Sequence, residues 1–252
     1  MIPLGDENPT LRPPYATYAL LIAIGAVWVL VQGAGFDVVR LAASVCDLGM
    51  VPGELTHRAP LGSGVPIGPG MACVVDDLPI NKWTPLTSMF LHGSWAHIIG
   101  NALYLWVFGD NVEDSMGRLR FMVFYLLCGL AAAGAHVLVD PASPVPTVGA
   151  SGAISGVLGA YLVLYPHAHI RMLFWFLFFV RVIVLPAWTV LIWWFITQVV
   201  AGLPDLMAVR REVSGGVAVW AHVGGFVAGL LLARFFVNER LHRARLAMED
   251  YF

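Results

Sequence analysis

The chain has 252 residues, of which 59% are hydrophobic and only 12% are charged. Its mean hydropathy is +0.77 and its pI is about 6.4. A soluble domain carries roughly 25% charged residues, so this chain has too little polar surface to cover a water-soluble body. Its composition excludes a soluble globular enzyme and a disordered tail protein, and its net charge of −2 excludes a nucleic-acid binder. An integral membrane protein remains.

Six apolar runs predict an all-α, polytopic membrane protein with six membrane-spanning helices, because a helix needs about 20 apolar residues to cross the hydrocarbon. The predicted spans are 15–34, 95–108, 121–139, 151–165, 186–203 and 217–237. Residues 1–14 are expected to be a short cytoplasmic N-terminus, 15–237 the six-span domain, and 238–252 a charged cytoplasmic tail. A long outer loop, about 36–94, separates the first two spans. It is rich in Gly and Pro and shows no periodicity, and a segment of this length without clear secondary structure is usually functional or disordered.

The apolar run Met172–Leu203 is longer than one span needs, and it contains Arg181 and Pro186. A charge at mid-membrane is costly and a proline interrupts a helix. We therefore interpret residues 172–185 as an interfacial segment and place the span at about 186–203.

Basic residues predict the orientation. With the N-terminus inside, nine of the 14 Lys and Arg residues fall on the cytoplasmic side, and three of the other five fall in the long first loop, which counts little. Both termini are therefore predicted to be cytoplasmic. The compact six-span chain without organelle-targeting features favours a bacterial inner membrane.

The three cysteines do not form a disulfide framework. Cys128 lies in an apolar run and is expected to be a small core residue. Cys46 and Cys73 both fall in the outer loop, where the compartment is oxidising. The sequence leaves open whether they form a disulfide, because it cannot supply the required Cα approach.

The run Ser151–Tyr165 is too short to cross the membrane as a helix. Its 15 residues give about 22 Å of helix, against about 30 Å of hydrocarbon. If Pro166 marks the cytoplasmic end, Ser151 begins a helix roughly 8 Å below the outer surface. Non-helical backbone at that depth is tolerated only when it is buried in protein or lines a water-filled cavity. We therefore expect Ser151 at the floor of a wet pocket and at a helix N-terminus, which favours developing negative charge.

Polar residues inside spans are candidates for function. His97 and Asn101 share one helix face because they are four residues apart. Gly225 and Gly229 follow His222 on the last span, and small residues allow two membrane helices to approach closely. Packing against the glycines of the Ser151 helix, among them Gly152, would bring Ser151 and His222 together, where a neutral His can take the Ser proton. Ser155, taken alone, is more often a backbone-bonded helix residue.

These residues resemble the motifs of the rhomboid family of intramembrane serine proteases, over about residues 83–233. The matching segments, in order, are His97-Ile98-Ile99-Gly100-Asn101, Glu113-Asp114-Ser115-Met116-Gly117, Gly149-Ala150-Ser151-Gly152 and Ala221-His222-Val223-Gly224-Gly225-Phe226-Val227-Ala228-Gly229.

The resemblance implies that Ser151 is the nucleophile and His222 the general base, in a dyad without a carboxylate. It also implies that His97, Asn101 and the backbone N–H of Ser151 bind the oxyanion, and that Gly225 and Gly229 pack the two helices together. No cofactor and no metal are implied. The implied partners are transmembrane protein substrates and the lipid bilayer.

One departure from the family matters for the site. Many members carry an aromatic residue one turn below the nucleophile, where it stacks on the base. This chain has Ser155 there, so another group must orient His222.

Two other functions stay open as alternatives. The first is an inactive relative that binds membrane proteins without cutting them, but such relatives lack the Ser or the His. The second is a transporter, which predicts charged residues along a path or an inverted repeat. Neither feature is found. Metal binding by His167 and His169 is disfavoured, because this pair precedes Arg171 at the expected interface.

Overall fold

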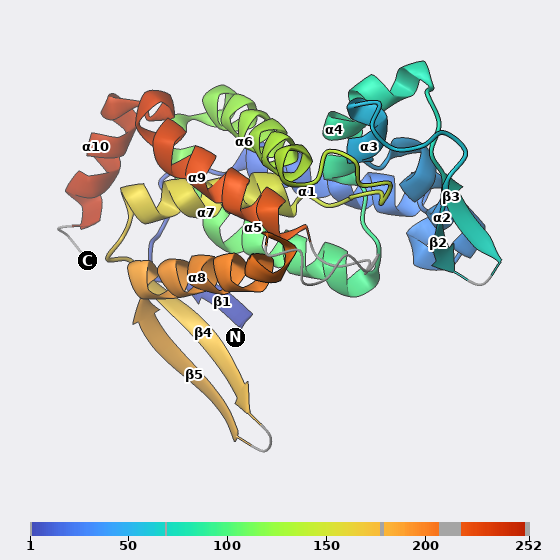
Figure 1. The fold of residues 1–252 in the computed structure, drawn as a ribbon. Coiled ribbons are helices and arrows are strands. Elements are labelled where there is room, and N and C mark those ends of the chain that lie inside the picture. Colours follow the sequence, from blue (N-terminus) through green and yellow to red (C-terminus); the bar gives the residue numbers. More distant parts are fainter. Residues whose placement is uncertain (1, 69, 177–178, 207–217, 250–252) are drawn as a thin grey trace.

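The computed structural model describes residues 2–68, 70–176, 179–206 and 218–249. Long helices dominate them and lie side by side (Figure 1). They are α1 (Tyr15–Ala26), α5 (Trp95–Met116), α6 (Arg118–Val139), α7 (Ser151–Leu164), α8 (Ala187–Leu206) and α9 (Val219–Phe236). Within the described ranges, three helices are long and apolar enough to cross a membrane: Arg118–Val139, Ala187–Pro204 and Val219–Phe236. The prediction of a mainly helical protein is confirmed, and the count of six spans stays a prediction.

Helix α7 lies at the centre of the bundle. Every residue from Gly152 to Tyr161 is buried, and the helix contacts α5, α6, α8 and α9. A helix that is apolar on all sides is stable only when other elements surround it. The start of α7, at Ser151, is thereby fixed relative to four neighbouring helices.

Helix α5 is longer than the sequence predicted. The apolar run was expected to end after Phe108, but the helix continues to Met116. Its added polar residues are buried with hydrogen-bond partners, as buried polar groups require. The Glu113 carboxylate accepts the backbone N–H groups of Ala16 at 3.0 Å and Thr17 at 2.7 Å. Glu113 thereby satisfies first-turn donors of α1 that the helix itself leaves unpaired.

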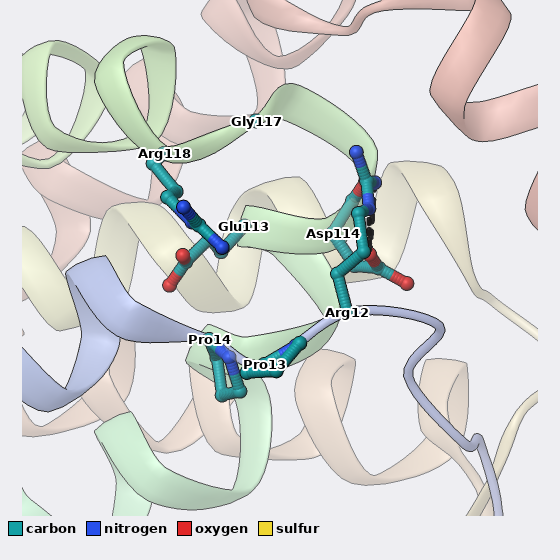
Figure 2. Close-up of a pocket in the computed structure, with 7 residues that line it drawn as sticks. All are labelled: Arg12, Pro13, Pro14, Glu113, Asp114, Gly117 and Arg118. Atoms are coloured by element: carbon teal, nitrogen blue, oxygen red, sulfur yellow. Dashed lines mark hydrogen bonds and ion pairs between the residues drawn. The ribbon is translucent and has the colours of Figure 1, made fainter.

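A cavity of about 340 Å³ lies where the N-terminal segment meets the junction of α5 and α6 (Figure 2). Arg12 forms an ion pair with Asp114 at 2.8 Å on one side of it. The Arg118 guanidinium lies 4.4 Å above the Tyr15 ring on another. This cavity is at the C-terminal end of α5, whereas His97 is in the first turn of that helix. The cavity is therefore remote from the candidate catalytic residues and is lined instead by residues of the second family motif, Glu113, Asp114 and Gly117.

The outer segment 36–94, which shows no periodicity in the sequence, contains regular structure. Its elements are α2 (Val38–Leu48), α3 (Pro52–Leu55), β2 (Gly64–Gly68), β3 (Met71–Val74), α4 (Thr84–Thr87) and 3₁₀ turns at 79–83 and 88–90. Most are too short for a periodic pattern to reveal them. A disulfide between Cys46 and Cys73 joins α2 to β3, which answers the question that the sequence left open. Cys128 is buried and free, as expected.

Two small antiparallel sheets make a purely helical description too narrow. One pairs β2 with β3, and the other has the order β1 (Ile2–Asp6), β4 (His169–Phe176) and β5 (Phe179–Pro186). The segment 172–185, expected at the interface, forms most of a β-hairpin. Its second strand is rich in β-branched residues, which favour strands over helices. Helix α8 then begins at Ala187, next to the proline that was expected to start the span.

The C-terminal tail is anchored to the bundle. It forms α10 (Glu239–Glu249), whose Arg245 is 1% exposed. The Arg245 guanidinium donates to the Tyr165 hydroxyl at 2.9 Å and also to the side chains of Asn8 and Asn111. A buried guanidinium is tolerated only with such partners, and this one ties both ends of the chain to α5 and α7.

Candidate active site

Ser151 and His222 are hydrogen-bonded to each other. Ser151 is the first residue of α7, and His222 lies in the first turn of α9. The Ser151 Oγ and His222 Nε2 atoms are 2.7 Å apart. His222 is only 8% exposed. The structure thus brings together two residues that are 71 positions apart in the sequence.

Glycines allow this approach of α7 and α9. A Cβ atom at Gly225 would lie 2.0 Å from the carbonyl oxygen of Gly152, and one at Gly229 would lie 2.0 Å from that of Gly156. No side chain fits at either position, so the two backbones are in direct contact, as small residues permit between membrane helices. Gly152 also faces α6, since its Cβ would lie 2.6 Å from that of Ala132.

The second nitrogen of His222 is bound by a residue that the sequence analysis did not select. Nδ1 of His222 lies 2.8 Å from the Oε1 atom of Gln198 on α8. The Trp194 ring, one turn earlier on the same face of α8, lies 5.9 Å from the His222 ring between centroids. The sequence could have indicated Gln198, because it is a polar residue within a predicted span. Gln198 and Trp194 are thus two residues of α8 that contact the His222 ring.

His97 lies beside Gly149 from α5, and Asn101 is one turn further along the same helix. His97 Nε2 and Ser151 Oγ would lie 2.7 Å and 3.5 Å from a Cβ atom at Gly149, so they flank this residue. Nδ1 of His97 accepts the backbone N–H of Gly93 at 3.4 Å. That bond leaves the proton on Nε2, the nitrogen near Ser151.

The Asn101 amide is buried without a partner. Its side chain is 7% exposed overall, and its Nδ2 atom has no hydrogen-bond acceptor among the described residues. Buried donors are normally paired, and an unpaired one costs about 1–3 kcal/mol. The Asn101 amide is thus a buried donor that remains available for a hydrogen bond.

Ser155 takes the backbone-bonded arrangement typical of a helix serine. Its Oγ donates to the carbonyl oxygen of Ser151 at 2.6 Å, and the residue is 1% exposed. This hydroxyl is one turn deeper than Ser151 and is already engaged. Of the two serines, Ser151 is the one hydrogen-bonded to His222.

The segment before α7 is held by the outer segment. The Gly149 N–H donates to the Ser88 carbonyl oxygen at 2.9 Å, and Met50 and Thr147 exchange backbone hydrogen bonds of 2.9 Å and 2.8 Å. Thr147 Oγ1 also lies 3.0 Å from His136 Nε2. These bonds pair part of the non-helical backbone that leads to Ser151.

The sequence matches a known protein family over the region that contains these residues. Residues 80–239 match the family model of the Rhomboid domain, which is more than half of the chain. The chain belongs to the Rhomboid family. The family match and the long apolar helices make it an integral membrane protein.

This rhomboid chain is similar in sequence to several curated proteins over part of its length. It is 44% identical over 80 residues to Rhomboid protease GluP of Bacillus subtilis, covering 32% of this chain and 15% of that protein. Rhomboid-like protease 5 of Toxoplasma gondii is 33% identical over 166 residues, covering 62% and 16% of the two chains. Rhomboid protein 1, mitochondrial, of Saccharomyces cerevisiae is 27% identical over 179 residues, covering 67% and 46%. The chain thus matches less than half the length of each of these relatives.

Proposed function

We propose that this protein is an intramembrane serine endopeptidase, which hydrolyses peptide bonds in or near the transmembrane segments of other membrane proteins. The observation that carries the proposal is the 2.7 Å hydrogen bond between Ser151 Oγ and His222 Nε2 at the start of α7. A serine hydroxyl is a weak nucleophile until an adjacent base accepts its proton. Membership in a family with relatives named as proteases supports the same activity.

The reaction follows from the roles of these two side chains. His222 Nε2 takes the proton of Ser151 as Oγ attacks the carbonyl carbon of the substrate. The protonated imidazole then gives this proton to the leaving amine as the peptide C–N bond breaks. Water attacks the resulting ester with His222 again as the base, which releases the carboxylic acid and restores Ser151.

Three groups are suited to bind the negative charge that develops on the substrate oxygen. They are the backbone N–H of Ser151 at the N-terminus of α7, the Nε2–H of His97 and the amide of Asn101. The unpaired Asn101 donor supports this assignment, since no acceptor among the described residues competes for it. Removing one such donor lowers the rate of a serine protease by about 10²–10³-fold.

The position of Ser151 determines the class of substrate. In the six-span arrangement that we propose, with both termini cytoplasmic, the start of the short helix α7 lies below the outer surface of the membrane. A transmembrane helix hides its carbonyl groups in i→i−4 hydrogen bonds. A substrate segment must therefore unwind locally at the cut site, which favours small residues and weak helix formers. We place the protein in a bacterial inner membrane.

The test is cleavage of a single-span reporter by the purified protein in detergent, with the Ser151→Ala and Ser155→Ala variants in parallel. We expect the wild type and Ser155→Ala to cut and Ser151→Ala to be inactive. Activity of Ser151→Ala, or loss of activity in Ser155→Ala alone, would contradict the assignment. If the wild type neither cuts nor reacts with a fluorophosphonate at Ser151, the protein is a relative that does not cut.

A further inference from the structure

We propose that Gln198 is a positioning residue that holds His222 in the tautomer and orientation that the reaction needs. This inference rests on the proposed function, because it assigns a role within that site. The amide oxygen of Gln198 can only accept a hydrogen bond. At 2.8 Å from His222 Nδ1, it fixes the ring proton on Nδ1 and leaves the lone pair of Nε2 directed at Ser151.

The Gln198 amide is itself oriented. Its Nε2 atom lies 3.5 Å from the Thr197 hydroxyl, which in turn donates to the Trp194 carbonyl oxygen at 2.6 Å. Rotation of the amide would place an NH₂ group against the N–H of His222 and lose the hydrogen bond. The Trp194 ring packs against the imidazole at an angle of 38°. One face of α8 therefore supplies both a hydrogen-bond acceptor and a packing surface for the base.

A neutral amide is suited to this place. Gln198 is only partly buried, so a carboxylate at this position would keep the acceptor at a modest cost, whereas the amide avoids placing a charge within the membrane. The amide oxygen accepts from Nδ1–H in both protonation states of His222. This bond is stronger when the ring is protonated, so the amide still favours the protonated ring. Gln198 thus takes the orienting role that a carboxylate has in a Ser-His-Asp triad.

The test compares two substitutions of similar size. Gln198→Met removes the acceptor, and Gln198→Glu retains it. We expect Gln198→Met to lower kcat by about 10²-fold, the lower end of what a general base contributes, with KM within about twofold of the wild type. We expect Gln198→Glu to recover at least about tenfold of that loss. Val200→Ala, on the exposed side of the same helix, is the matched control and should cut like the wild type.

A second readout separates positioning from folding and from the proposed function. The rate of fluorophosphonate labelling at Ser151 needs the base but no substrate binding, so it should fall with kcat in Gln198→Met while the Tm is unchanged. If Gln198→Met labels and cuts like the wild type, or if Gln198→Glu is as impaired as Gln198→Met, the role of Gln198 is refuted and the dyad stands. If the wild type itself neither labels nor cuts, both are refuted.

The β4–β5 hairpin carries a second, independent inference. We infer that it lies in the membrane interface, with lipid against its apolar faces. Val180, Val182 and Val184 alternate along β5 and are 60%, 54% and 45% exposed. Ile183 points to the opposite face and is 41% exposed. Strand β5 is the last strand of its sheet, so one side of its backbone has no strand partner among the described residues.

Strand β5 has exposed apolar side chains and an open backbone edge, and the boundary between lipid headgroups and acyl chains accommodates both. In water, a long apolar edge strand promotes aggregation. Within hydrocarbon, unpaired backbone groups cost several kcal/mol each. At the boundary the valine side chains leave water, while headgroups and water bind the open backbone edge and the exposed Arg181. The hairpin projects away from the bundle, below α8 in the view of Figure 1.

Spin labelling in nanodiscs of zwitterionic and anionic lipid tests this inference. A nitroxide at Val182→Cys should collide with oxygen more often, relative to a water-soluble nickel chelate, than a nitroxide at the exposed Arg58→Cys of the outer segment. The native cysteines do not interfere, because Cys46 and Cys73 are bonded to each other and Cys128 is buried. Equal collision ratios at the two positions refute the inference. Dipolar broadening between labels also refutes it, since the hairpin would then contact a second copy of the chain.

Discussion

The substitution Gly225→Ala tests whether the backbone contact of α7 and α9 sets the geometry of the dyad. The added Cβ would lie 2.0 Å from the Gly152 carbonyl oxygen, whereas an ordinary contact is at least 3.4 Å. Since the obstacle is backbone, the helices must separate by about 1.4 Å. Gly225 is one turn from His222, so a similar shift would stretch the 2.7 Å bond to Ser151 beyond hydrogen-bond length.

We expect this separation to lower kcat by about 10²-fold, the cost of a misplacement of about 1 Å. Overpacking should also lower the free energy of unfolding by about 1–3 kcal/mol. The assay is reporter cleavage with a parallel thermal unfolding curve. Gly134→Ala is the control, because this helical glycine of α6 has nothing within 4 Å of a Cβ position and should tolerate alanine. A Gly225→Ala variant with kcat within threefold of the wild type would refute the reasoning.

Three further changes test the fold. Glu113→Gln removes the charge from the bonds to the α1 N–H groups and should cost about 1–2 kcal/mol by unfolding measurements; an unchanged Tm would contradict the capping role. Replacing both Cys46 and Cys73 by Ser removes a bridge across 27 positions and should cost about 3.5 kcal/mol of loop entropy; a Tm equally insensitive to reductant in wild type and variant would contradict it. Burial raises the pKa of Asp6 from 3.8 to about 6, so the folded state binds this proton more tightly than the unfolded state. Stability should therefore fall as the pH rises from about 4 to about 6, by at most about 3 kcal/mol. Asp6→Asn should gain stability over the wild type across this window, and a constant difference between the two would contradict the assignment.

The parts of the fold that the sequence predicted are those with local signals. Helices α6, α7 and α9 begin and end within a few residues of the apolar runs, because Gly, Pro and charged residues bound those runs. Helix α7 starts at Ser151, as its preceding prolines indicated. The glycine pattern indicated the contact of α7 with α9 for a physical reason, since only small residues permit backbones to touch.

The parts that the sequence missed depend on partners far along the chain. The end of α5 appeared polar because Glu113 bonds to α1, 96 positions away, and no local pattern shows that pairing. Gln198 was overlooked for the same reason. A single amide in an apolar run has no visible role until the fold places it beside His222, 24 positions later.

The unpaired amide of Asn101 implies that the site is kept at some cost in stability. Asn101→Ala removes a buried donor that has no partner among the described residues, and alanine is a better helix former than asparagine. We therefore expect its thermal stability to equal or exceed that of the wild type, although most substitutions of buried residues destabilise. Its kcat should fall by about 10²–10³-fold, as for other lost oxyanion donors. A variant that loses both stability and activity would instead show that the Asn101 amide supports the fold, and the oxyanion assignment would have to pass to His97 and the Ser151 N–H.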